Sequence, residues 1–424
     1  MTEEFLHYIW KYRLFDNKNL ATTSGESLKI IKVGEHNTDS GPDFFNSRIK
    51  IGNTEWAGNI EVHISASDWI KHRHQNDKAY DNVVLHVVYE SDRKIYRKNG
   101  ELIPTLELKN KFDKKIYQKY QDFKSNKDWI PCEKQISKVD RFIVDNWLDR
   151  LLTERLERKS NYIVESLKLN QNNWEETFYQ HMARSFGFKV NAEPFELLAK
   201  SLPNSILAKH KDNLFQIEAL LFGQAGMLTK KFEEEYLSSL RKEYKFLQQK
   251  FRLKPINSHL WKFLRLRPSN FPTIRISQFA ALIHKSTHLF SRILETENIK
   301  TLKNLLSVEA SEYWKNHYTF QKVSAGKRKH LGESAIDIII INTIVPFLFV
   351  YGKQKNEEEY INRALKFLEK IKSEKNSVID KWGKLKISAK SAYSTQALLQ
   401  LKNEYCDNKK CLQCAVGNKL LSLY

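Results

Sequence analysis

The sequence has few of the features that mark exported proteins. It contains only four cysteines in 424 residues, and neither a repeat nor a low-complexity linker is apparent. The first residues, Met-Thr-Glu-Glu, lack the basic and apolar regions of a secretory signal. We therefore expect a cytoplasmic protein whose cysteines do not pair as disulfides.

Long apolar runs are also missing. The most apolar stretch, residues 335–351, contains Asp337, Asn342 and Pro346. It is shorter than the roughly 20 residues that cross a bilayer. We therefore expect no membrane partner, and we predict a buried helix that ends or kinks near Pro346.

Acidic residues are outnumbered by basic ones. There are 70 Lys and Arg against 50 Asp and Glu, a net charge of +20. Such an excess favours a polyanionic partner, because neutralising phosphates releases counterions. A nucleic acid is the expected partner. An AT-rich genome, however, enriches all of its proteins in lysine and produces the same composition. DNA and RNA present the same phosphates, so composition does not choose between them.

The most informative stretch lies between residues 41 and 64. Two runs, 44–51 and 56–64, alternate apolar and polar residues and are separated by the turn signal Gly52-Asn53. This pattern predicts a β-hairpin. Asp43 precedes its first strand, and Glu61 and His63 point to the same face of the second. Such an oxygen-rich cluster suits a hard divalent cation, Mg²⁺ or Mn²⁺.

Further strands are predicted at residues 28–34, 83–89 and 104–108, with helices at 2–15, 67–81 and 110–128. Polar side chains at or near these elements are candidates to support the metal cluster. They are Glu35, His74, Asp77 and His86. His86 interrupts a β-branched run, where a lone histidine is more often a hydrogen-bonded core residue than a ligand.

Asp43, with Glu61-Val62-His63 eighteen positions later, resembles the metal motif of the PD-(D/E)XK, or restriction-endonuclease-like, nucleases. The resemblance covers about the first 125 residues and implies an αβββαβ core. It also implies magnesium held by the two acids, with an additional ligand from the first helix, here Glu4. Glu4 also has a simpler role as a partner of the helix dipole. His63 stands where that family usually has lysine, and a neutral imidazole can act as base but supplies no permanent charge.

The whole chain also resembles an uncharacterised bacterial domain-of-unknown-function family. Its shared features are the GPDF segment, the Glu-x-His strand, an Asp-Trp helix and a cysteine-bearing tail. This second resemblance implies no activity.

The histidines allow another interpretation. His63, His72, His74 and His86 lie within 24 residues, close to several aspartates, and this mixture suits zinc, manganese or iron. On one helix, His72 and His74 would point about 200° apart, so only one is expected to reach a shared ion. We favour His74.

From about residue 139, long segments of helical period replace the strands. We predict two domains, a nuclease-like domain at 1–130 and a large, basic all-α domain at 131–424. A loop containing Lys327, Arg328 and Lys329 is a weak candidate for phosphate binding, with an ordinary solvated turn as the alternative.

Three of the four cysteines, Cys406, Cys411 and Cys414, crowd the end of the chain, and the fourth is Cys132. Together they can surround one metal, structural zinc first and an iron–sulfur cluster second. Buried free cysteines are the alternative.

The leading hypothesis is a metal-dependent nuclease in which Asp43 and Glu61 hold the metal and His63 positions or deprotonates a water. One alternative is a catalytically decayed nuclease fold that binds nucleic acid. Another is a metal-dependent hydrolase of a different substrate. The sequence does not indicate an oligomeric state.

Overall fold

The computed structural model describes residues 1–286 and 288–422. Its internal contacts divide the chain into two units, which are described separately. The first unit comprises Met1–Trp147 and Leu401–Tyr424, and the second comprises Leu148–Gln400. The C-terminal segment therefore belongs to the first unit, whereas the predicted boundary at residue 130 placed it in the helical domain. The reason is that helix α18 (Ala415–Ser422) packs against α3 (Lys114–Ser125).

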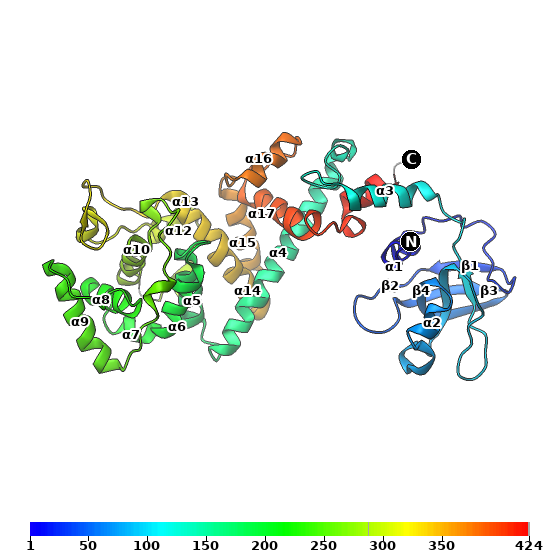
Figure 1. The fold of residues 1–424 in the computed structure, drawn as a ribbon, viewed down its shortest axis with the longest axis horizontal. Coiled ribbons are helices and arrows are strands. Elements are labelled where there is room, and N and C mark those ends of the chain that lie inside the picture. The colour runs from blue at the N-terminus through cyan, green and yellow to red at the C-terminus, as the bar shows by residue number, and fades with distance from the viewer. Residues whose placement is uncertain (287, 423–424) are drawn as a thin grey trace. The chain divides into compact units, whose positions relative to one another are not determined.

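The first unit is built on one mixed sheet, seen in blue in Figure 1. Its strands are β1 (Leu28–Lys32), β2 (Glu35–His36), β3 (Phe44–Ile51), β4 (Thr54–Ser65), β5 (Val83–Glu90) and β6 (Thr105–Glu107). The order is β1-β3-β4-β5-β6, with β2 also paired to β3. Strands β3 and β4 are antiparallel and pair Ile51 with Thr54, which confirms the predicted hairpin at Gly52-Asn53. Strands β4, β5 and β6 are parallel.

Burial explains which strands are central. The first six residues of β5 are all buried, as expected for a strand covered on both faces. In β4 the burial is concentrated at 60–63, near the strand's C-terminal end. This buried end of β4 carries the Glu61 and His63 side chains, so the sheet places polar groups where water is scarce.

Three helices accompany the sheet: α1 (Glu3–Lys11), α2 (Asp68–Lys71) and α3. The Thr2 side chain caps α1 by accepting a hydrogen bond from the Phe5 N–H at 3.3 Å. Helix α2 is much shorter than the predicted helix at 67–81. It stops because Arg73 adopts a left-handed conformation with φ of 62°, and two 3₁₀ turns follow, His74–Asn76 and Lys78–Tyr80.

The second unit is mainly helical, as predicted (Figure 1). Helix α4 (Arg141–Leu169) crosses the division between the units. The helices that follow are α5 (Trp174–Phe186), α6 (Ala192–Ser201), α7 (Asn204–Ala208), α8 (Leu214–Gln224), α9 (Glu235–Phe251), α10 (Pro272–Lys285), α11 (Leu289–Glu295), α12 (Ile299–Leu306), α13 (Glu333–Ile339), α14 (Val345–Lys355), α15 (Glu358–Lys370), α16 (Ser377–Lys384) and α17 (Ala392–Gln400). A small hairpin joins β7 (His317–Thr319) to β8 (Lys322–Val323).

Helices α13 and α14 form one continuous apolar helix, Glu333–Lys355. It is long and apolar enough to cross a membrane, but 78% of its apolar window is buried inside the protein. It therefore serves as a core helix. The helix does not end near Pro346, and a π-helical turn at Ile340–Ile344 precedes this proline. Such a turn changes the hydrogen-bonding register of the backbone and lets a helix continue past a missing proline N–H.

Candidate metal centre of carboxylates and histidines

Asp43 and Glu61 are held together by two hydrogen bonds between side chain and backbone. The Val62 N–H donates to Asp43 Oδ2 at 2.9 Å, and the Asp43 N–H donates to Glu61 Oε2 at 3.2 Å. This exchange occurs where β3 begins, at the pairing of Phe44 with Ile60. The two predicted acidic residues are therefore adjacent and oriented by the sheet itself.

His63 occupies the buried centre of the group and is 2% exposed. Its Nδ1 lies 2.8 Å from Nε2 of His86, which is completely buried on the neighbouring strand β5. Its Nε2 lies 3.1 Å from His72 Nδ1 and 3.4 Å from Glu61 Oε1. If Nδ1 of His63 donates its proton to His86, the Nε2 lone pair is free to bind a cation.

His72 and His74 both reach His63, contrary to the prediction that only one of them would. The prediction assumed a continuous helix, whereas the left-handed Arg73 ends that helix between the two histidines. The ring of His74 stacks on that of His63 with centroids 5.2 Å apart, and its Nε2 lies 3.2 Å from Glu61 Oε1. The backbone break therefore brings both imidazoles into the group.

The resulting arrangement resembles a ligand set. One ligand atom from each of His63, His72 and His74 lies within 4.8 Å of the other two, and this is the one such group of histidine, cysteine or acidic residues within 1–286 and 288–422. The buried Nε2 of His74 makes no aligned hydrogen bond in that part of the chain, despite the nearby Glu61 oxygen. The three imidazoles are therefore a group that could hold a metal ion, with the Glu61 carboxylate beside them.

Burial sets the charge states of the group. It lowers the pKa of His63 to about 2, helped by the neighbouring imidazoles, and it lowers that of His86 to about 3. Both rings are therefore neutral at physiological pH, as a metal ligand and its supporting ring must be. Burial raises the pKa of Glu61 above its ordinary value, and the contact with His74 offsets this only partly.

Helix α1 contributes residues that the sequence interpretation did not assign. His7 Nε2 lies 3.2 Å from Asp43 Oδ2. Burial lowers the pKa of His7, but the Asp43 carboxylate more than compensates, so the pKa is raised overall. Glu3, one turn before His7, also responds to this group: burial raises its pKa and nearby His72 lowers it. The sequence signal was the spacing of Glu3 and His7, which places them on one helix face.

Other candidates lie elsewhere. Glu4 accepts a hydrogen bond from the Tyr120 hydroxyl at 3.0 Å, because it points to a different side of α1 from Glu3. Glu35 is exposed and pairs with Lys32 at 2.9 Å. Asp77 accepts a bond from the Ala79 N–H at 2.9 Å and so caps a 3₁₀ turn.

The basic loop of the second unit is less open than predicted. Lys329 is 6% exposed, and its Nζ donates to the carbonyls of Lys315 at 2.6 Å and Lys327 at 3.0 Å. Arg328 pairs with Glu309 at 3.5 Å. Lys329 is therefore a structural cation that holds the loop, since two carbonyls already occupy its donors, whereas Lys327 and Arg328 are exposed to solvent.

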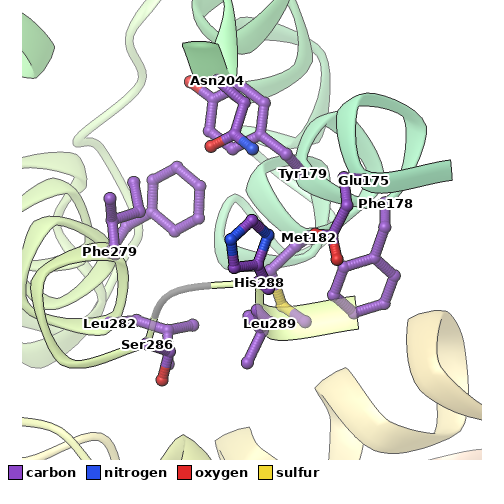
Figure 2. A pocket seen from close by; sticks show the side chains of 11 residues that line it. Glu175, Phe178, Tyr179, Met182, Asn204, Phe279, Leu282, Ser286, His288 and Leu289 are labelled. Carbon is purple, nitrogen blue, oxygen red and sulfur yellow. The ribbon is translucent and has the colours of Figure 1, made fainter. Parts of the chain in front are cut away.

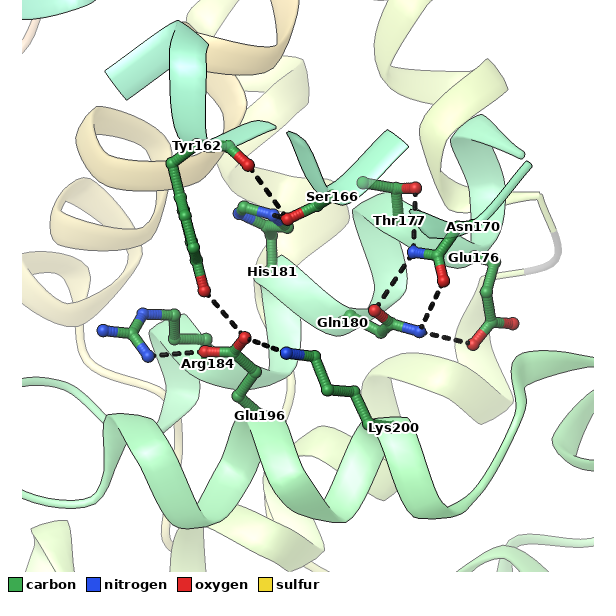
Figure 3. Close-up of polar contacts among 10 residues, drawn as sticks. All are labelled: Tyr162, Ser166, Asn170, Glu176, Thr177, Gln180, His181, Arg184, Glu196 and Lys200. Atoms are coloured by element: carbon green, nitrogen blue, oxygen red, sulfur yellow. Dashed lines mark hydrogen bonds and ion pairs between the residues drawn. The ribbon is translucent and has the colours of Figure 1, made fainter. Parts of the chain in front are cut away.

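A second polar cluster, in the second unit, surrounds Glu196 (Figure 3). Its carboxylate accepts hydrogen bonds from Tyr162 at 2.7 Å, Arg184 at 2.5 Å and Lys200 at 2.6 Å. Burial raises the pKa of Glu196, but the three donors outweigh burial and lower this pKa to about 2. Such a fully paired carboxylate ties helices together and has no ligand position left.

A pocket in the second unit is lined mostly by apolar side chains, together with Glu175, Asn204 and His288 (Figure 2). Its volume of about 50 Å³ holds a few water molecules and is far below that of typical ligand sites. Glu175 already accepts bonds from the N–H and the hydroxyl of Ser291. The pocket is therefore a packing defect rather than a second candidate site.

The fold and the site define a class: a two-unit α+β protein with a buried carboxylate and imidazole group on its sheet. The comparisons agree with the broader of the two sequence resemblances. The chain belongs to the family described as "Protein of unknown function (DUF2851)", which matches residues 3–377. No curated protein and no solved structure matches the chain.

Proposed function

We propose that this protein is a metal-dependent nuclease that hydrolyses phosphodiester bonds of DNA or RNA. The observation that carries the proposal is the convergence of Asp43 and Glu61 with His63, His72 and His74 at the buried end of β4. Carboxylates and imidazoles that converge in this way together supply the ligand atoms that a cation requires. The mixed sheet and the acid spacing are compatible with a restriction-endonuclease-like core.

The ligands favour Mn²⁺ or another first-row transition ion over Mg²⁺, because imidazole suits those ions and magnesium prefers oxygen. When bound, such an ion polarises the scissile phosphate and lowers the pKa of a bound water. Glu61, His63, His72 and His74 would hold it. His63 is too buried to meet a substrate, so in this proposal it is a ligand and not the general base.

Asp43 and His7 form the more open side of the group, with side chains 22% and 21% exposed. Because the Asp43 carboxylate raises the pKa of His7, this imidazole can carry a positive charge nearer to neutral pH than a free histidine. In the proposal it holds a proton beside the substrate phosphate. It would thereby supply the charge that lysine provides in the resembling nucleases.

The proposal is tested by cleavage of labelled single- and double-stranded DNA and RNA with Mn²⁺ or Mg²⁺. The matched proteins are the wild type, the Asp43→Ala, Glu61→Ala double variant, and Glu196→Gln as a control outside the site. Metal-dependent cutting that disappears only in the double variant supports the nuclease. Equal cutting by all three proteins would exclude this site. Salt-sensitive binding without cutting by any of them would support a decayed nuclease fold instead.

A second candidate is a metal-dependent hydrolase of a substrate other than nucleic acid. The group of His63, His72 and His74 favours it, because three imidazoles are as suitable for zinc-assisted hydrolysis as for phosphodiester chemistry. Salt separates the two candidates. Binding through a phosphate backbone must weaken steeply as salt is added, whereas binding of a small neutral substrate must not.

A further inference from the structure

All four cysteines of the chain line one pocket. Cys132 lies between α3 and α4, and Cys406, Cys411 and Cys414 come from the C-terminal segment. All four are free thiols, three of them buried and Cys406 half-buried. Residues so rare and so distant in sequence meet here because Leu401–Tyr424 belongs to the first unit.

The backbone of the segment is shaped around these side chains. A π-helical turn, Leu401–Cys406, ends at the first thiol, and a 3₁₀ turn, Cys411–Gln413, carries the second. Helix α18 begins immediately after Cys414 and passes so close to Cys411 that a Cβ at Gly417 would lie 2.2 Å from the Cys411 carbonyl oxygen. Only glycine fits at position 417, so the close approach of α18 to the 3₁₀ turn at Cys411 depends on this glycine.

The Cys414 thiol lies beside backbone N–H groups, and its pKa is nevertheless raised overall. Burial raises the pKa of this thiol, while the backbone N–H groups of Val416 and Gly417 and the side chain of Trp147 act in the opposite direction. These N–H groups belong to the start of α18, where the helix dipole also favours negative charge. Burial and the neighbouring cysteines also raise the pKa of the other three thiols, in agreement with their position in one enclosed group.

We propose that Cys132, Cys406, Cys411 and Cys414 bind one thiolate-ligated metal centre that fastens the C-terminal segment to the sheet unit. The proposal does not depend on the nuclease assignment, because it uses none of the residues of the histidine group. Four thiolates are the ligand set of structural zinc and of iron–sulfur clusters alike.

Two observations bear on which centre is bound. No three of the four sulfurs lie within 4.8 Å of one another among the described residues, whereas zinc–sulfur bonds of about 2.3 Å place tetrahedral sulfurs roughly 3.8 Å apart. A [4Fe–4S] cluster needs wider spacing, since each of its four thiolates binds a different iron. The pocket volume of about 20 Å³, however, is that of a single ion or water. To bind zinc, the four sulfurs must move closer together. To bind a cluster, the pocket must become larger.

The test uses the full-length protein, expressed and purified without oxygen. Zinc, iron and acid-labile sulfide are measured per chain, together with visible absorption from thiolate-to-iron charge transfer. The variants are Cys132→Ser and Cys414→Ser, with Gln413→Ser as the matched control because Gln413 is exposed between two of the cysteines. The His72→Ala, His74→Ala double variant removes metal bound at the histidine group, and each cysteine variant is made in this background as well.

We expect about one zinc, or iron and sulfide in equal amounts, retained in Gln413→Ser and in the histidine variant and lost in both cysteine variants. Zinc without visible absorption identifies a single ion, and iron with sulfide identifies a cluster. Metal retained after Cys132→Ser in the His72→Ala, His74→Ala background would overturn the proposal. So would a wild type that holds no such metal and takes up neither Zn²⁺ nor Fe²⁺ with sulfide.

A second experiment tests the proposal even if the cysteine variants do not fold. Chelation of the wild-type protein, followed by hydrogen exchange of residues 401–422, measures the fastening directly. Faster exchange in that segment after metal removal is expected, and unchanged exchange would refute the structural role. Loss of nuclease activity has no part in either readout, so failure of this proposal and failure of the proposed function are distinguishable.

Discussion

Two carboxylates, the buried Glu61 of the first unit and the half-buried Glu196 of the second, are surrounded by polar side chains in different ways. Glu196 in the second unit receives hydrogen bonds from Tyr162, Arg184 and Lys200 (Figure 3). Two of these donors are permanent cations. As a result the pKa of Glu196 falls to about 2 despite its burial, which acts in the opposite direction.

Glu61 in the first unit pairs with no Lys or Arg among the described residues. Its oxygens meet the Asp43 N–H at 3.2 Å and two imidazoles, His63 at 3.4 Å and His74 at 3.2 Å. Burial raises its pKa, so the charged form is under-compensated. A buried acid that the protein neutralises by itself is structural, whereas one left short of positive charge is a candidate ligand for an external cation.

The largest expected difference between the two acids is catalytic. Glu61→Gln should reduce metal-dependent cleavage by about a thousandfold or more, because it removes the negative ligand of the site. Glu196→Gln should leave cleavage nearly unchanged in folded protein. Initial rates at saturating Mn²⁺ measure both. A loss of activity shared equally by the two variants would contradict the contrast.

The next largest difference is expected in Mn²⁺ affinity, between variants of His86 in the first unit and His181 in the second. His86 contacts Nδ1 of His63 at 2.8 Å, so His86→Leu should weaken Mn²⁺ binding by about 10- to 100-fold, as supporting partners of metal ligands do. His86→Gln, which keeps a hydrogen-bonding group, should recover part of the affinity. The control is His181→Gln in the second unit, where the ring contacts Ser166. Titration calorimetry that finds all three variants equal to the wild type would remove His86 from the site.

For folding stability, we expect the larger effect from the substitution at Glu196 and the smaller one from the substitution at Glu61. Glu196→Gln should destabilise the second unit by about 2 kcal/mol, since it removes a charge with three donors and leaves them under-paired. Glu61→Gln should be neutral or stabilising in metal-free protein, because it relieves the burial of an under-compensated charge. Urea unfolding followed by hydrogen exchange of each unit separates the two effects.

The second unit should also lose stability in mild acid. Burial lowers the pKa of His181 to about 4 from 6.5, so the unfolded chain binds a proton in that window that the folded chain does not. Stability is therefore complete above pH about 6.5 and falls as the pH drops toward 4, by about 1 kcal/mol per pH unit. Unfolding of wild type and His181→Gln at several pH values checks this. A glutamine variant with the same slope would assign the effect to other groups.

The smallest expected difference lies within α1. Glu3→Gln should change Mn²⁺ affinity only a few-fold, because Glu3 acts on the group through space from a partly exposed position. Glu4→Gln should have no effect on affinity, since its partner is Tyr120. The reverse outcome in the same calorimetric titration would place Glu4 at the metal.

Local sequence patterns predicted much of the first unit. Alternation and the Gly52-Asn53 turn determine the β3–β4 hairpin, and the spacing of two places Glu61 and His63 on one face. Helical period likewise predicted most helices of the second unit. These features depend on residues that are near neighbours in the chain, so the sequence alone contains the information for them.

The composition of the candidate site was decided by tertiary structure. His7 reaches Asp43 only because α1 lies near β4, and Cys132 meets the C-terminal thiols only because the last segment returns to the first unit. His72 joins the group because one residue, Arg73, adopts φ of 62° and turns the backbone between two histidines. A single dihedral angle and contacts over hundreds of residues leave no periodic signal in sequence, because packing of the whole unit selects them.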